Sequence, residues 1–344
     1  MPSMIRKIMV SLLIFGLCLG MCAQAQAMQT KENGVKVLTF GIIPTDSLAQ
    51  LTKWFEPYAQ ALAEKMGPKY EIETKYASDY AGIIEGMRFG KVDFSLFGNK
   101  SALEASKRAK GEVFAQVANA DGTPGYWSHI IVHQDSPYTS MDEIIEHADE
   151  LVFGNGDPNS TSGYLVPSYF IWGQRGITPE KIFKEVRNAS HEANCMAVAR
   201  GQVDFATNNN GAIERFKESN PELGKQIKVV WKSPLIPNDP MVWHTELPRE
   251  VKSALKAAVL GFGRTGPTAE DEREMLYNMQ EGFAPFYNSD NRQLLPIRQL
   301  NLAKNKLQIE ANQDLSPAEK EKRIAKIDAQ LKELQKYVKL GKKY

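Results

Sequence analysis

Apolar runs with strand character alternate with segments of helical spacing along most of this chain. The first strand-like segments are 36–43, 70–77 and 92–97, and the first helical ones are 54–66, 80–89 and a helix from Ser101. Each switch of period, from two residues to between three and four, marks a change of element. This βαβ succession predicts an α/β fold with mostly parallel sheets, right-handed crossovers and ligand groups at the carboxyl ends of the strands.

Two turn-rich, extended stretches interrupt the alternation, at 119–125 and at 233–240. Between them we expect a second alternating block, with strands near 128–133, 150–153, 203–206 and 228–231. We interpret the two stretches as crossings between two lobes. Lobe I would hold 36–120 and 236–300, and lobe II would hold 121–235. A cleft between two lobes is a common ligand site.

The N-terminus has the three parts of a secretory signal peptide, which we assign to residues 1–27. Arg6 and Lys7 precede an apolar stretch that ends at about Met21, and a small-x-small motif closes at Ala27. The stretch is too short to read as a membrane span. Loss of the two basic residues lowers the basic count from 42 to 40 against 41 acids, so the net charge moves from +1 to −1. This balance argues against nucleic acid as a partner.

Cysteine usage fits an exported protein. Cys18 and Cys22 leave with the signal peptide, so Cys195 is the one thiol of the mature chain and no internal disulfide can form. Cys22 as a lipid acceptor ranks below simple cleavage, because Met21 stands where lipidation needs a small residue. Cys195 lies in an apolar helical run, which is typical of a buried small hydrophobe.

The run NGDPNSTSG at 155–163 places three hydroxyl residues between a turn and an apolar helical segment. Ser160 or Thr161 would cap that helix. Free N–H groups and the positive end of the helix dipole favour an oxyanion there, and the hydroxyl of Ser162 adds a further donor. The run therefore predicts a cradle for a tetrahedral PO₃ or PO₄ group. An ordinary helix cap is the alternative interpretation.

Five further residues fall at turns or element ends that would face the cleft: Tyr80, Tyr126, Trp127, His191 and Asp239. An enzyme would need more than this. His191 could act as a base for Ser160 or Ser162, but no third residue completes a catalytic set, and no nucleophile elbow, Walker loop or Cys-x-x-Cys motif is present. The residues therefore favour binding over catalysis, and they predict neither a metal nor a cofactor.

Four runs resemble the phosphonate-binding periplasmic component of ABC importers: DYAGIIEGMRF at 79–89, DGTPGYWS at 121–128, FGNGDPNSTSG at 153–163 and WKSPLIP at 231–237. The resemblance extends over about residues 38–302. It implies a two-lobed periplasmic binding protein fold of the type II kind, a periplasmic location and an inner-membrane ABC permease as partner.

The resemblance also implies roles for individual residues. The phosphonate group would be bound by Ser160, Thr161, Ser162 and His191. Tyr80 and Tyr126 would line the cleft, and Asp239 would face the organic substituent. Binders of aminoalkylphosphonates in this family carry an acid shortly after a Thr-Asn-Asn sequence, whereas this chain has Gly211 there. An ammonium group would then face Asp239 alone unless Glu214 reaches in, and incomplete pairing of a buried cation is costly.

We therefore predict a solute-binding protein that captures an alkyl- or aminoalkylphosphonate for ABC import. One alternative keeps the fold and changes the ligand to phosphite, phosphate or another small oxyanion. A second alternative is an exported phosphoester hydrolase.

Residues 301–344 form a predicted C-terminal helical extension. Its last helix begins with the capping box Ser-Pro-Ala-Glu at 316–319. An apolar stripe follows at three- and four-residue spacing: Ile324, Ile327, Leu331, Leu334 and Val338. The stripe packs either on its own chain or on a second copy in a homodimer, and the spacing leaves both open.

Overall fold

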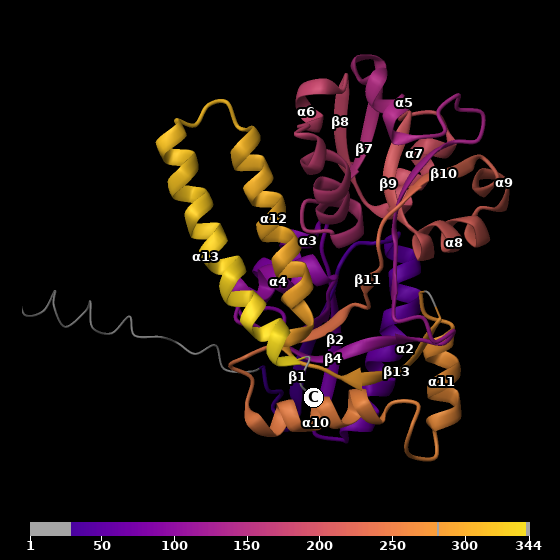
Figure 1. Cartoon of the computed structure of the whole chain (residues 1–344). Coiled ribbons are helices and arrows are strands. Elements are labelled where there is room, and N and C mark those ends of the chain that lie inside the picture. Colours follow the sequence, from indigo (N-terminus) through magenta and orange to yellow (C-terminus); the bar gives the residue numbers. More distant parts are fainter. Residues whose placement is uncertain (1–28, 281, 342–344) are drawn as a thin grey trace, which may run out of the picture.

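The computed structural model describes residues 29–280 and 282–341. The predicted signal peptide, with Cys18 and Cys22, lies outside the described residues. The described chain forms two lobes with a sheet each, a short ribbon between them and a helical hairpin along one side (Figure 1). The two-lobed α/β fold predicted from the sequence is confirmed.

Lobe I is built on a six-stranded sheet. Across the sheet the strands are β13 (Phe283–Asn288), β4 (Gly111–Asn119), β12 (Pro240–His244), β3 (Phe94–Leu96), β1 (Lys36–Ile42) and β2 (Tyr70–Tyr76). Its helices are α2 (Leu48–Met66), α3 (Tyr80–Arg88), α4 (Asn99–Arg108), α10 (Arg249–Gly261) and α11 (Ala269–Tyr277), with a 3₁₀ turn η5 (Asn291–Leu294). Helix α2 buries Trp54, Tyr58 and Leu62, which recur at helical spacing and pack in the same core as Phe40 of β1.

Lobe II is built on a five-stranded sheet. Across the sheet the strands are β10 (Ile227–Lys232), β6 (Ser128–His133), β9 (Phe205–Asn209), β7 (Val152–Gly156) and β8 (Glu185–Ala189). Its helices are α5 (Met141–Glu146), α6 (Pro179–Ile182), α7 (His191–Ala199), α8 (Asn210–Ser219) and α9 (Pro221–Gly224). Shorter turns are η1 (Ala148–Glu150), the π-helical η2 (Thr161–Leu165) and η3 (Ser168–Trp172), and η4 (Gly173–Arg175).

The prediction of mostly parallel sheets is wrong, because both sheets are mixed. Strand β1 runs parallel to β2 and β3, whereas β12 runs antiparallel to β3 and β4. In lobe II, β7 runs parallel to β8 and β9, whereas β6 runs antiparallel to β9 and β10. Strands β6 and β12 follow the two crossings, so each enters its sheet from the other lobe rather than from a βα unit. Their direction is set by the crossing and not by the local alternation.

The two crossings pair with each other between the lobes. Strand β5 (Gly125–Tyr126) runs antiparallel to β11 (Ile236–Pro237), with Ile236 opposite Tyr126. Gly125 is required here, because a Cβ at this position would lie 2.0 Å from the carbonyl oxygen of Ile236. This ribbon connects the lobes and is the structural candidate for a hinge.

The C-terminal extension forms a hairpin of α12 (Leu295–Ala311) and α13 (Pro317–Gly341). Ser316 accepts a hydrogen bond from the backbone N–H of Glu319, as the predicted cap requires. The apolar stripe of α13 packs on α12, where Ile327 and Leu334 form a buried cluster with Leu302. The side chain of Val338 lies outside the described part of the chain. A homodimer through α13 therefore remains a prediction, and its two buried stripe residues already contact their own chain.

Candidate functional site

A cavity lies between the lobes and is lined by residues of both. Its lining includes the seven residues predicted to bind the ligand: Tyr80, Tyr126, Ser160, Thr161, Ser162, His191 and Asp239. Trp127, which was also expected to face the cleft, does not line the cavity, and its ring lies against the ammonium group of Lys232. The lining also includes polar residues that the sequence analysis did not assign to the site: Thr45, Asn119, Asn209, Arg215, Asn238 and Gln280. Apolar side chains complete the wall: Ile43, Leu96, Val117 and Phe283.

The three hydroxyl residues begin the π-helical turn η2 and are at most 3 % exposed. Ser160 caps the turn, because its Oγ accepts a hydrogen bond of 3.0 Å from the N–H of Gly163. The N–H of Leu165 bonds to the carbonyl of Ser160, five residues back, so the turn is wider than the α-helix that the sequence suggested.

Thr161 joins the cradle to lobe I. Its Oγ1 accepts a hydrogen bond of 2.9 Å from the N–H of Lys100, in the first turn of α4. Gly98, the N-cap of α4, allows this approach, since a Cβ there would lie 3.3 Å from Thr161 Oγ1. Thr161 Oγ1 accepts this bond and keeps its own hydrogen for a ligand.

Four helix N-termini meet around the cavity. Tyr80 and His191 are the first residues of α3 and α7, Thr161 is the first residue of η2, and Lys100 is the second residue of α4. Each start places the positive end of a helix dipole at the cavity, and the backbone N–H groups of Tyr80 and Lys100 themselves donate hydrogen bonds to Asp157 and Thr161. The convergence of these helix starts on three buried hydroxyls makes the site suited to an anion.

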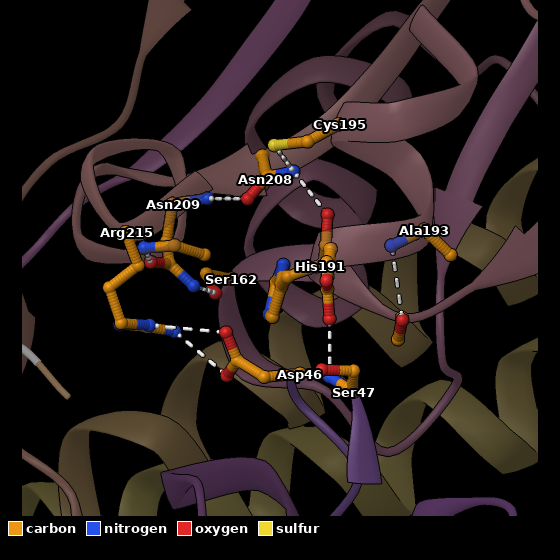
Figure 2. A network of polar contacts seen from close by, with 12 residues as sticks. Asp46, Ser47, Ser162, His191, Ala193, Cys195, Asn208, Asn209 and Arg215 are labelled. Atoms are coloured by element: carbon orange, nitrogen blue, oxygen red, sulfur yellow. Dashed lines mark hydrogen bonds and ion pairs between the residues drawn. The ribbon is translucent and has the colours of Figure 1, made fainter. Parts of the chain in front are cut away.

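His191 is held at the start of α7 by contacts of its backbone. Ser190 caps the helix by accepting from the N–H of Ala193, and Asn208 donates to the carbonyl oxygen of His191 (Figure 2). The ring Nε2 lies 3.5 Å from Ser160 Oγ, and Nδ1 is buried without a hydrogen-bond partner among the described residues. Burial lowers the pKa of His191 to about 4, so the ring is neutral near pH 7 and offers one donor and one acceptor.

Tyr80 adds a phenol to the same side of the cavity. Its backbone N–H donates to Asp157 across the lobes at 3.3 Å, and its hydroxyl lies near Ser160. Burial, and then the charge of Asp157, raise the pKa of Tyr80 far above its usual value. The hydroxyl therefore stays protonated and can donate to an oxyanion.

Asp239 and Tyr126 come together from the two crossings. Asp239 Oδ1 accepts hydrogen bonds from the Tyr126 hydroxyl at 3.1 Å and from Asn99 Nδ2 at 3.0 Å. A Cβ placed on Gly98 would lie 4.0 Å from Asp239 Oδ2 and 3.3 Å from Thr161 Oγ1, so both atoms are near the same residue. The carboxylate and the cradle are therefore close together, which restricts a ligand that touches both to a small molecule.

A buried ion pair at the edge of the cavity was not predictable from the sequence. Arg215 of α8 donates to both oxygens of Asp46, which follows β1, at 3.2 and 3.1 Å (Figure 2). The two side chains are 10 % and 7 % exposed, and they join lobe II to lobe I. Asn209 Nδ2 also reaches Ser162 Oγ at 3.4 Å. Only Asn209 carried a local signal, since it belongs to the Thr-Asn-Asn run.

The alternative acid proposed for an amine is excluded. Glu214 is exposed on α8 and does not line the cavity, so it does not reach the site in this structure. Gly211 is buried in the first turn of α8. Asp239 is the carboxylate that lines the cavity among the described residues.

Among the described residues, no group of three or more His, Cys, Asp or Glu side chains is placed to hold a metal ion. Cys195 is fully buried and accepts a hydrogen bond from Asn208. Burial raises its pKa to about 12, so it is a thiol at neutral pH, as its apolar context predicted. Within the same residues, no helix is both long and apolar enough to cross a membrane.

Two mixed α/β lobes, a ribbon of two crossing strands and an anion-suited cavity between the lobes define a two-lobed solute-binding protein. Comparison with known proteins is more specific. Residues 40–294 match the family described as ABC transporter, phosphonate, periplasmic substrate-binding protein. The chain belongs to this family.

Individual relatives agree with this assignment. The chain is 45 % identical over 303 residues to the phosphonates-binding periplasmic protein of Escherichia coli, covering 88 % of this chain and 87 % of that protein. It is 43 % identical to a solved binding protein component of an ABC phosphonate transporter from Pseudomonas aeruginosa, with a TM-score of 0.84 over 89 % of this chain and 99 % of that one. A phosphate-import protein of Mycolicibacterium smegmatis is 26 % identical over 76 % of this chain and 84 % of its own length.

Proposed function

We propose that this protein captures a small phosphonate in the cleft between its lobes and delivers it to an ABC permease. The phosphonate oxygens are bound by Ser160, Thr161, Ser162 and His191, with the Tyr80 hydroxyl as a further donor. The observation that carries the proposal is the convergence of these buried donors with four helix N-termini on one cavity. Such a site favours a group with several negatively charged oxygens.

The organic substituent lies toward Tyr126 and Asp239. The apolar wall of Ile43, Leu96 and Val117 suits a short alkyl chain, and Asp239 offers an acceptor to a polar end group. Asp239 would repel a second phosphate-type charge at this position, which favours a phosphonate with a neutral or cationic substituent. The cradle alone also fits phosphate and phosphite, so the substituent region decides between these ligands.

Family membership and the secretory pattern at the N-terminus together support a periplasmic location for the mature protein. The lobe boundaries that we propose, at 36–120 with 236–300 and at 121–235, are supported by the strands that each sheet contains. Closure of these lobes around the ligand would present one defined shape to the permease.

Titration calorimetry of the mature chain tests the proposal. The ligands are methylphosphonate, ethylphosphonate, 2-aminoethylphosphonate, phosphite and phosphate, with sulfate as a tetrahedral control. We expect at least one phosphonate to bind more tightly than phosphate and sulfate. Binding of phosphate alone would refute the phosphonate assignment. Turnover of a chromogenic phosphate ester, abolished by mutation of Ser160, would instead support the hydrolase.

A further inference from the structure

Helix α12 contacts both lobes beside the ligand cavity. It packs on α4 of lobe I and on η2, η3 and η4 of lobe II, and α13 covers its other side (Figure 1). The family match ends at residue 294, one residue before α12 begins. The helix therefore follows the matched segment directly and lies where the lobes meet.

The contact is an apolar junction of three elements. Leu103 of α4, Leu165 of η2 and Ile297 of α12 form one buried cluster, and they are 4 %, 0 % and 3 % exposed. Leu300 of α12 packs on this cluster and also on a second one that contains Tyr126. Ile297 and Leu300 therefore contact side chains from lobe I, lobe II and the first crossing.

These partners are connected directly to the anion site. Leu165 is the last residue of the turn that begins with Thr161. Leu103 follows Lys100 by one turn of α4, and the N–H of Lys100 donates a hydrogen bond to Thr161 Oγ1. One face of α12 thus packs on both α4, which carries the donor of this hydrogen bond, and η2, which carries its acceptor.

We propose that Ile297 and Leu300 are positioning residues for ligand capture, which hold α4 and the Ser160–Ser162 cradle together in the closed cleft. The inference rests on the proposed function. When the lobes open about the β5–β11 ribbon, α12 must separate from one of them and expose apolar surface. That cost is present only in the open state, so α12 stabilises the closed state and slows ligand release.

Several positively charged side chains also meet at this junction. Lys304 of α12 lies near Lys100, Lys107 and Glu104 of α4, and burial followed by the charge of Lys100 lowers the pKa of Lys304 to about 8. Arg298 adds a further cation beside Lys107. Glu104 is already ion-paired with Lys100 and Lys107, so Lys304 adds a further cation around one acid. Lys304→Met, which keeps the apolar stem and removes the charge, should therefore strengthen the contact between α12 and α4.

The test compares Ile297→Ala with a matched control on the same helix. Leu302→Ala also removes a buried aliphatic side chain from α12, but Leu302 packs on Ile327 and Leu334 of α13 and not on the lobes. Release of methylphosphonate is followed by stopped-flow tryptophan fluorescence. We expect Ile297→Ala to speed release about 10-fold or more with association nearly unchanged, because truncating a buried Ile is costly and most affinity changes appear in the off-rate.

Leu302→Ala should release ligand within about 2-fold of the unmodified protein, since its lost contacts are the same in open and closed states. Lys304→Met should slow release. Equal release rates for Ile297→Ala and Leu302→Ala, or faster release from Lys304→Met, would overturn the inference.

Small-angle scattering of the ligand-free proteins gives a readout that needs no ligand. Ile297→Ala should have a larger radius of gyration than Leu302→Ala, and equal radii would count against α12 as a positioning element. If the unmodified protein binds no phosphonate while the radii differ as expected, the proposed function fails and the role of α12 in closure stands.

Discussion

Replacing Thr161 by Val tests the cradle most sharply, because Val keeps the shape of the side chain and removes only the hydroxyl. Thr161 Oγ1 accepts from the N–H of Lys100 at 2.9 Å, and we propose that its hydrogen is donated to the ligand. A hydrogen bond to a charged group contributes about 1.5–3 kcal/mol, and leaving a buried N–H without a partner costs about 1–3 kcal/mol. Both losses occur in the closed, liganded state. Affinity should therefore fall by at least about 70-fold, the lower bound of about 2.5 kcal/mol.

Titration calorimetry measures this loss, and two controls separate it from misfolding. Thr161→Ser restores a hydroxyl and should recover most of the affinity. The melting temperature of ligand-free Thr161→Val should stay close to that of the unmodified protein, because the Lys100 contact joins two lobes that separate on opening. Unchanged affinity for every phosphonate in folded Thr161→Val would refute the cradle and leave the three hydroxyl residues as a helix cap.

Three further predictions follow from the site and the hinge. His191 has a pKa of about 4 in the folded protein against an ordinary 6.5, so between these pH values the unfolded chain binds a proton that the folded chain does not. The free energy of unfolding should therefore drop as pH falls below 6.5, by about 3 kcal/mol at pH 4. Urea denaturation of His191→Gln should show a smaller drop. The unmodified protein should prefer 2-aminoethylphosphonate to ethylphosphonate only weakly. Gly211→Glu should add about 1–3 kcal/mol of preference for the amine, measured by calorimetry. A preference above about 100-fold without the mutation would show that another acid pairs with the amine. Ligand should reduce the radius of gyration in small-angle scattering by hinge bending near 122–125 and 233–237, and superimposable curves would speak against closure.

Local patterns predicted the elements better than their arrangement. The strand expected at 128–133 is β6 (Ser128–His133), because alternating apolar residues and flanking turns are contained in a few positions. The direction of β6 and β12 was not predictable in the same way. It depends on where each crossing enters its sheet, and no residue within either strand encodes that.

The candidate site follows the same division. Ser160, Thr161 and Ser162 could be predicted as site residues because hydroxyls, turn and helix start are contiguous, and the resemblance to a family supplied residues as distant as Asp239. The pair of Arg215 and Asp46 was missed because its members are 169 residues apart and each alone resembles a surface charge. Likewise, the apolar stripe of α13 required a partner, but its spacing did not distinguish α12 from a second copy.

A crystal structure of the mature protein with methylphosphonate tests the central claim most directly. The account predicts a phosphorus atom between the lobes, with its oxygens within hydrogen-bond distance of the Ser160, Thr161 and Ser162 side chains and of the His191 ring, and with the methyl group directed toward Tyr126. Density for the ligand outside this cavity, or within it but bound through Asp239 and the hinge with the cradle hydroxyls unoccupied, would contradict the account.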